Sequence, residues 1–314
     1  MNKEKYRQLC QETDSIPIYS KDWWLDIVCG ESNWDVCIVE KGNQIIAAMP
    51  YVIKRKFGFI LLSHPPLTQK LGPWFRDSYF NNNKRLSNEK IILTELESQL
   101  PKCHYFSQNW HYKNTNWLPM YWKGYSQTTR YTYQIKALSD LDAVWKCIEN
   151  STRRQIKKAK EKLDLKIDMA APVDEFLDLN QKTFERQGMK LPYSPELVRK
   201  VYAACKERNA CDVFVVSDQD GNRHAGIFVI HDEQTTYYIM GGADPTYRSS
   251  GAMSFCMWEA IQKAAERNNE FDFEGSMIEP IEQFFRKFGA EQVPYYNVNK
   301  VWSLPIRLAL AIKK

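Results

Sequence analysis

The strongest constraint on the fold lies between residues 211 and 301, where β-rich runs precede an alternation of helix and strand. The runs CDVFVVS, HAGIFVIHD and TTYYIMGG are separated by turn residues, a spacing that is typical of an antiparallel meander. A helix with one apolar face follows, its buried positions being Met253, Cys256, Met257, Ala260, Ile261 and Ala264. The strand FDF, the helix IEQFFRKFG and the strand VPYYNVNKVWSL complete the series. This order predicts an α/β protein of the α+β kind, with a mixed sheet.

The chain before residue 211 adds two further groups of elements. WDVCIVE and QIIAAMPYVIK flank the turn KGN and predict a hairpin. After the predicted strand TTRYTYQI, helices are expected at about 140–163, 173–187 and 194–208. Because 314 residues are many for one compact domain, we expect two. The predicted boundaries are 1–130 for an N-terminal half and 131–314 for a C-terminal half.

Capping residues mark the ends of some expected helices. Ser194 precedes Pro195, a combination that is typical of a helix start. Ser20 is expected to cap a short helix within YSKDWWLDIVCG, which Gly30 ends. The run SLPIRLALAIKK is apolar with a basic end. We predict a docked helix there, with a contact to a membrane surface as the alternative.

The composition argues against several classes of function. A net charge of +5 permits anionic partners without indicating a dedicated nucleic-acid surface. No run approaches the roughly 20 apolar residues that a membrane span requires. The eight cysteines form no C-x-x-C pair and several lie in apolar runs, which indicates the reduced thiols of a cytoplasmic protein. The sequence contains no H-E-x-x-H, G-x-S-x-G or G-x-x-x-x-G-K-[ST] pattern, so neither a metal site nor a P-loop is predicted.

The segment YRSSGA joins the last meander strand to the amphipathic helix. A glycine-containing turn at a helix start presents backbone N–H groups at the positive end of the helix dipole. Such a turn can hold a phosphate or pyrophosphate, and Arg248 would add positive charge. The alternative is an ordinary connection between a strand and a helix.

The order of strand, R-x-x-G-A, helix, strand and F-x-K-x-G resembles the GNAT acyltransferases. This resemblance implies that acetyl-CoA or another acyl-CoA is the donor substrate. It also implies that the donor pyrophosphate is held by Arg248, Ser249, Ser250, Gly251 and Ala252. The chain departs from the pattern at Met253, where the family motif has glycine or alanine.

A closer resemblance is to the GNAT-fold branch of Fem-type peptidyltransferases and polysaccharide-locus acetyltransferases. The segments that carry it are RRQIKKAKEK at 153–162, FDFEGS at 271–276 and FFRKFG at 284–289. The resemblance covers residues from about 130 to 300 well and the first third of the chain only loosely. It implies two GNAT-like halves, that is, a tandem GNAT-like fold.

Two further segments are candidates for substrate contacts. The basic helix around RRQIKKAKEK could place Arg153 and Arg154 on a phosphate-bearing donor or acceptor, although a solvated face is an equal alternative. No aromatic residues interleave this run, which argues against base stacking and a tRNA partner. The loop FERQGMKLPYSPE offers Arg186, Gln187 and Tyr193 as a second substrate-binding group.

An amine acylation needs a base for the attacking nitrogen and an acid for the leaving thiolate. By strand alternation Phe271 and Phe273 share one face, while Asp272 and Glu274 share the other. Glu274 is the candidate base and Asp272 its supporting residue. Phe285 stands where the resembled families carry an acidic tyrosine or a lysine. The acid is therefore sought among Tyr237, Tyr238, Tyr295 and Tyr296, with Tyr238 as the candidate, and the alternative is that the moderately acidic thiolate leaves unaided.

The resemblance therefore implies an acyl-CoA-dependent N-acyltransferase, with an acetyl group as the expected acyl group. The resemblance implies a small amine or amino sugar as acceptor and a setting in cell-envelope or polysaccharide synthesis. The alternatives are a Fem-type transferase that uses aminoacyl-tRNA, the one case in which nucleic acid is a partner, and a non-catalytic binding protein of the same fold.

Overall fold

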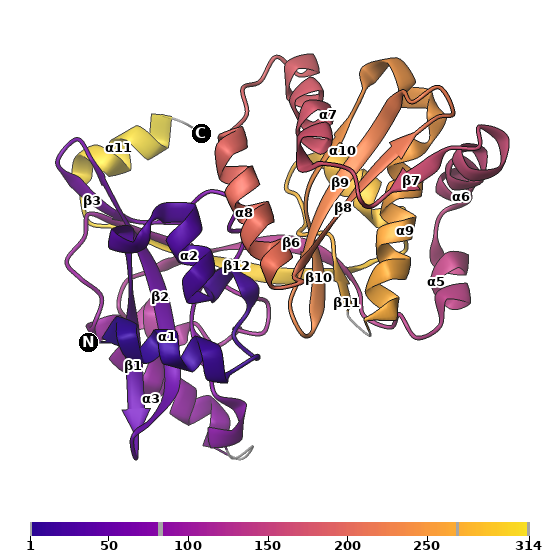
Figure 1. The fold of residues 1–314 in the computed structure, drawn as a ribbon. Coiled ribbons are helices and arrows are strands. Elements are labelled where there is room, and N and C mark those ends of the chain that lie inside the picture. The colour runs from indigo at the N-terminus through magenta and orange to yellow at the C-terminus, as the bar shows by residue number, and fades with distance from the viewer. Residues whose placement is uncertain (1, 81–83, 268–269, 313–314) are drawn as a thin grey trace. The chain divides into compact units, whose positions relative to one another are not determined.

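The computed structural model describes residues 2–80, 84–267 and 270–312 of the chain (Figure 1). The chain divides into two compact units. One comprises residues 1–130 and 294–314, and the other comprises residues 131–293. The division falls within β6 (Ser126–Ile135) and β12 (Glu291–Val301). None of the described helices combines the length and the apolar content that crossing a membrane requires.

The sheet of the first unit has the strand order β1-β2-β3-β5-β12, with β4 paired to β2. Its strands before the division are β1 (Trp34–Lys41), β2 (Gln44–Lys56), β3 (Phe59–Leu62), β4 (Trp74–Phe75) and β5 (Tyr105–Asn109). The predicted hairpin is confirmed, because β1 and β2 pair antiparallel with Lys41 opposite Gln44. Gly42 and Asn43 both have positive φ in the two-residue turn, the conformation that tight hairpins favour.

Helices cover both faces of this hairpin. They are α1 (Asn2–Glu12), α2 (Asp22–Cys29), α3 (Arg85–Ser98) and α4 (Leu118–Trp122). Residues of α1 and α2 pack with Trp34, Val36 and Ile38 of β1, whereas those of α3 pack with the alternating residues Cys37 and Val39. A strand that is buried on both faces reads as a continuous apolar run, as VCIV at 36–39 does.

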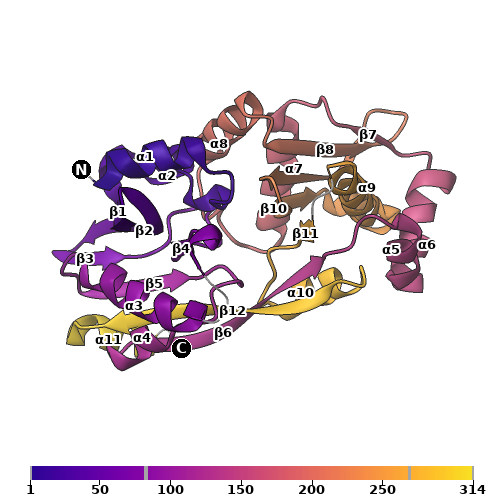
Figure 2. The same cartoon turned by 90° about the horizontal axis from the view of Figure 1, so that it is seen from below.

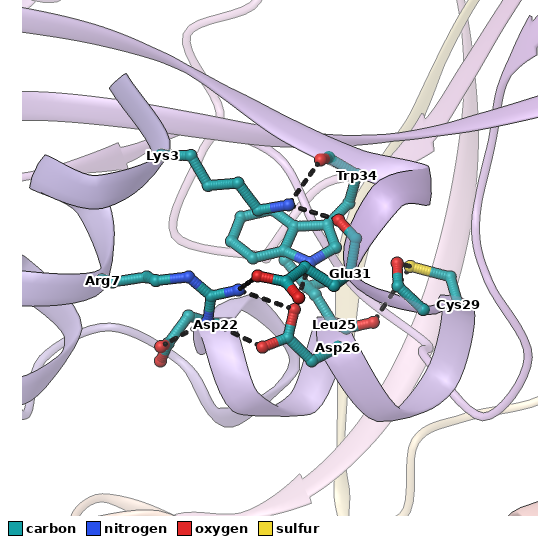
Figure 3. Close-up of polar contacts among 9 residues, drawn as sticks. Lys3, Arg7, Asp22, Leu25, Asp26, Cys29, Glu31 and Trp34 are labelled. Carbon is teal, nitrogen blue, oxygen red and sulfur yellow. Dashed lines mark hydrogen bonds and ion pairs between the residues drawn. The ribbon is translucent and has the colours of Figure 1, made fainter. Parts of the chain in front are cut away.

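A network of charged side chains ties α1 to α2 (Figure 3). The Arg7 guanidinium donates to Asp26 at 2.7 and 3.0 Å, to Asp22 at 3.2 Å and to Glu31 at 2.9 Å. Asp26 also accepts the indole N–H of Trp34 at 2.8 Å. Because Trp34 begins β1, this network anchors the first helix to the sheet.

The second unit has the strand order β6-β11-β10-β9-β8-β7. Its strands are β7 (Lys166–Asp168), β8 (Cys211–Ser217), β9 (Arg223–His231), β10 (Thr235–Ala243) and β11 (Glu270–Asp272), together with the end of β6. The antiparallel meander is confirmed in β8, β9 and β10. Parallel pairing of β11 with β10 makes the sheet mixed, as the sequence predicts.

The helices of the second unit lie on opposite faces of its sheet. They are α5 (Leu141–Cys147), α6 (Asn150–Lys157), α7 (Val173–Arg186), α8 (Pro195–Glu207), α9 (Ala252–Glu266) and α10 (Glu279–Arg286). The buried face of α9 packs with Ile227 of β9, and the neighbouring residue Phe228 meets Phe176 of α7. Both views show α5 and α6 beside α9 (Figures 1 and 2).

Three of the expected helix features differ from the structure. Ser20 lies in a 3-10 turn, and α2 begins at Asp22 without a side-chain cap. The helix expected over 140–163 is divided, because Glu149 donates its N–H to the carbonyl of Lys287 at 2.9 Å between α5 and α6. The apolar helix α11 (Leu304–Ile312) forms, but the prediction that it docks is wrong because none of its residues is buried.

Candidate functional site

The strands β10 and β11 diverge after a short pairing. Three residue pairs join them, from Thr235 with Glu270 to Tyr237 with Asp272. From that point β11 ends, whereas β10 runs on to Ala243. On its other side, the register of β10 against β9 shifts between Tyr238 and Met240, which is a β-bulge. Bulges re-aim side chains and often occur beside active sites, so this end of β10 is the natural centre of a candidate site.

Tyr238 lies at the bulge. Its ring makes an edge contact with Phe285 at a centroid distance of 5.6 Å. Its hydroxyl oxygen is so close to Gly241 that a Cβ built there would lie 2.3 Å away. Burial raises the pKa of Tyr238 well above its ordinary value. The phenol therefore keeps its proton at neutral pH.

The two candidate carboxylates differ in their surroundings. Asp272 is fully buried and accepts hydrogen bonds from the hydroxyl of Thr132, from the amide of Gln134 at 2.9 Å and from the N–H of Glu274 at 2.7 Å. The last bond turns the backbone, and Glu274 adopts a left-handed φ of 60°. The strand alternation that we expected to include Glu274 therefore stops at Asp272. Glu274 is 6% exposed and is held close to the strand end by Asp272.

The loop before α9 is held against α6. Gly251 has φ of 82°, and a Cβ there would lie 2.3 Å from the carbonyl oxygen of Gln155. Lys158 donates its ammonium to the carbonyl of Ser249 at 2.8 Å, and Ser254 donates its hydroxyl to the Gln155 side chain at 2.9 Å. The structure thus brings the predicted phosphate loop and the predicted basic helix together. Arg248 and Ser249 are exposed, whereas Ser250 and Ala252 are buried.

The basic face of α6 continues into two neighbouring pockets. Arg153, Arg154 and Lys157 line the first, together with Trp145 and Asn150. The second shares Trp145 and Lys157 with the first and adds Trp258, Lys160 and Gln262, among other residues.

Trp145 and Trp258 form an aromatic pair that the sequence analysis missed. Their ring centroids are 5.0 Å apart. The side-chain oxygen of Gln262, in the same pocket, is buried without a hydrogen-bond partner in the described part of the chain. Aromatic residues are absent from the run RRQIKKAKEK itself, but α5 and α9 bring these tryptophans to it.

The predicted substrate loop is only partly connected to this site. The hydroxyl of Tyr193 donates to the side-chain oxygen of Asn180 at 2.9 Å, and the Asn180 amide donates to the carbonyl of Gly241 at 2.8 Å. Burial raises the pKa of Tyr193 to about 12. Tyr193 is therefore coupled to the bulged end of β10. Arg186 ends α7, and both it and Gln187 are exposed at the surface.

Phe285, where the resembled families carry tyrosine or lysine, is a core residue. It is 3% exposed and contacts Phe273 at a centroid distance of 5.3 Å as well as Tyr238. Its position explains why a phenylalanine is accommodated there. Over residues 2–80, 84–267 and 270–312, the structure contains no cluster of His, Cys, Asp and Glu side chains suited to a metal ion.

Comparison with known proteins agrees with this architecture. Residues 148–279 match the family model described as the acetyltransferase (GNAT) domain. The crystal structure of FemX is 12% identical, with a TM-score of 0.68, and the match covers 100% of this chain and 99% of that one. No curated protein matches the chain significantly in sequence.

Two further solved structures share the fold. L-PGS from Bacillus licheniformis is 12% identical with a TM-score of 0.56, over 99% of this chain and 96% of that one. A tandem GNAT protein from the clavulanic acid biosynthesis pathway is 7% identical with a TM-score of 0.50, over 90% and 94%. The resemblance predicted from the sequence is confirmed: residues 148–279 match the model of the GNAT acetyltransferase domain, and the chain has the fold of FemX and of tandem GNAT proteins.

Proposed function

We propose that this chain is a cytoplasmic N-acyltransferase that uses acetyl-CoA or another acyl-CoA to acylate a small amine or amino sugar. We also propose that each unit is one GNAT-like half, the second carrying the donor site. The observation that carries the proposal is the divergence of β10 from β11 beside the loop at the start of α9. Where two strands separate, there is room for the extended part of an acyl-CoA. The positive end of the helix dipole at a helix start favours binding of its phosphates.

The donor would contact three groups of residues in the second unit. Its pyrophosphate would meet the loop Arg248–Ala252, with further positive charge from Arg153, Arg154 and Lys157. Its nucleotide end would lie at the pocket of Trp145 and Trp258, where an indole ring can stack on a base. The thioester would then reach Tyr238 at the bulge of β10.

The reaction would proceed by direct attack of the amine on the thioester carbonyl. Glu274, positioned by Asp272, would take a proton from the nitrogen as the new N–C bond forms. The C–S bond would break, and the leaving thiolate would take a proton from the phenol of Tyr238. Arg186, Gln187 and Tyr193 would contribute to the acceptor side, with Tyr193 acting through Asn180.

Thermal unfolding with and without acetyl-CoA tests the donor assignment. At a concentration of about 100 times its dissociation constant, a ligand that binds only the folded state stabilises it by roughly 2.7 kcal/mol. We expect the unfolding midpoint to rise with acetyl-CoA and to rise less in the variant Arg153→Ala/Arg154→Ala. An unchanged midpoint with every acyl-CoA tested would exclude the proposed donor. An acetylation assay of the wild type separates an enzyme from a binding protein.

Transfer from aminoacyl-tRNA is a second candidate, favoured by one observation. The aromatic pair of Trp145 and Trp258 beside Arg153 and Arg154 supplies stacking residues that the basic run lacks on its own. We would adopt this candidate if the chain bound tRNA in a salt-dependent manner and lost that binding when Arg153, Arg154, Lys157 and Lys158 were all replaced by alanine.

A further inference from the structure

The helix α11 (Leu304–Ile312) is apolar around its whole circumference. Arg307 is its one charged residue, and none of its nine residues is buried. Leu304 is 63% exposed, Leu308 57% and Ile312 85%. A helix that is hydrophobic all round is normally surrounded by an apolar environment. The exposure of α11 therefore indicates a partner that covers it.

The helix α3 of the same unit shows what an ordinary surface helix looks like. It also exposes large apolar residues, Leu86 and Ile91, but its opposite face buries Ile92, Leu93 and Leu96 in the core. Isolated exposed residues of this kind are common on protein surfaces and require no partner. In contrast, α11 has no buried face on which to dock.

Positive charge accompanies this apolar helix. The sequence contains no Asp or Glu from Gln292 to Lys314, whereas Lys300, Arg307, Lys313 and Lys314 are basic. The ammonium of Lys300 lies 4.8 Å from the ring centroid of Trp302, which is 44% exposed and lies two residues before α11. Tryptophan beside cationic side chains is typical of segments that lie at the boundary between lipid headgroups and acyl chains.

We propose that α11, together with Trp302 and Lys300, binds an anionic phospholipid surface. A lipid layer can surround all sides of an apolar helix, whereas a protein groove covers one face. Nine helical residues rise by about 14 Å, less than half of the roughly 30 Å of a bilayer's hydrocarbon core, so the contact involves one leaflet. Lys300 and Arg307 would meet the negative headgroups.

Vesicle sedimentation of the full chain tests this inference. The vesicles contain either phosphatidylcholine alone or equal parts of phosphatidylcholine and phosphatidylglycerol. We expect the protein to sediment with the anionic vesicles and to be released as salt is raised. The variant Leu308→Glu/Ile312→Glu should weaken this binding by at least about tenfold. The matched control, Leu86→Glu/Ile91→Glu, makes the same charge change on α3 and should bind the anionic vesicles within about threefold of the wild type.

The outcomes separate the possible occupants of this surface. All the replaced side chains are exposed, so circular dichroism and the unfolding midpoint should match those of the wild type. Equal loss of binding in both variants, or no binding by the wild type, would overturn the proposal. Analytical ultracentrifugation would also overturn the proposal if it showed a dimer that dissociates in Leu308→Glu/Ile312→Glu. In that case a second copy of the chain would cover α11. Stronger sedimentation with neutral than with anionic vesicles would contradict the role given to Lys300 and Arg307.

Discussion

The strand pair β1–β2 of the first unit and the pair β10–β11 of the second end their pairing in opposite ways. The first remains paired from Trp34 with Val52 to its tight turn, and helices bury it on both faces. The second pairs over three residues and then parts. Beyond that point Asn180 donates its amide to the carbonyl of Gly241 in β10, and residues 245–250 lead from β10 into α9. The continuous pairing of β1 with β2 contributes to the packed core, whereas the separation of β10 from β11 leaves the end of β10 available for the proposed site.

The largest effect should come from Glu274→Gln, if the reaction takes place where β10 and β11 separate. Loss of a general base typically lowers kcat by about 10²–10⁴-fold. The control is Glu270→Gln, at the paired end of β11, which should leave kcat nearly unchanged. Steady-state acetylation rates would compare the two variants. Similar activity of Glu274→Gln and the wild type would remove Glu274 as the base.

Acid should destabilise the first unit through His64. Its Nε2 accepts the N–H of Asn109 at 2.6 Å while its Nδ1 lies 2.9 Å from the carbonyl oxygen of Thr68, an arrangement that suits the neutral ring. Burial lowers the pKa of His64 to about 4. Since the unfolded chain then binds more protons between about pH 6.5 and 4, stability is full above this range and falls as pH is lowered through it.

The contribution of His64 should be on the order of 3 kcal/mol across that range. Urea unfolding at several pH values, followed by a probe in the first unit, measures it. We expect His64→Gln to be less stable at neutral pH and to show a flatter pH dependence. A pH dependence that is as steep in His64→Gln as in the wild type would assign the acid sensitivity to other groups.

The loop that borders the open strand pair should tolerate no side chain at its glycine. Gly251→Ala would bring a Cβ to 2.3 Å from the Gln155 carbonyl oxygen. This clash should destabilise the second unit by about 1–3 kcal/mol beyond the cost of placing alanine at a left-handed φ. Gly188→Ala measures that backbone cost alone, because Gly188 also has a left-handed φ but a Cβ there would have nothing within 4 Å. Thermal unfolding of both variants tests this difference, and equal midpoints would show that the loop can move away from α6.

The smallest effect should come from the charged network of the first unit. Arg7→Ala leaves Asp22 and Asp26 without their guanidinium and should destabilise the fold by about 1–2 kcal/mol, with no change in acetyl-CoA binding. Arg199→Ala, which breaks an exposed pair with Asp174, serves as the control and should change stability little. A loss of donor binding in Arg7→Ala would contradict the assignment of the donor site to the second unit.

Local patterns in the sequence predicted the elements better than the contacts among them. The meander, the buried face of α9 and the Ser194 cap were predictable, because each depends on neighbouring residues; Ser194 accepts the N–H of Leu197 at 3.2 Å. The Ser20 prediction failed because Ser20 ends a 3-10 turn and Lys21, not Ser20, occupies the N-cap position of α2. The aromatic pair of Trp145 and Trp258 joins residues far apart in the sequence, so no local pattern could indicate it.

The candidate carboxylates are a second case in which the sequence predicted the position of a residue but not its contacts. Alternation correctly separated Asp272 from the core phenylalanines, but it could not predict that Asp272 would accept hydrogen bonds from Thr132 and Gln134 of β6. Those bonds form only when β11 and β6 pair, which is a property of the tertiary fold. Likewise, the closeness of the loop before α9 to α6 depends on a glycine packed against the Gln155 backbone.

Amide hydrogen exchange with and without acetyl-CoA tests the proposed donor site, because it reports both whether the donor binds and where. We predict slower exchange over residues 238–243 of β10 and over 248–254 at the start of α9, with little change in β1 and β2. Protection confined to the first unit, or exchange that acetyl-CoA leaves unchanged throughout, would contradict it.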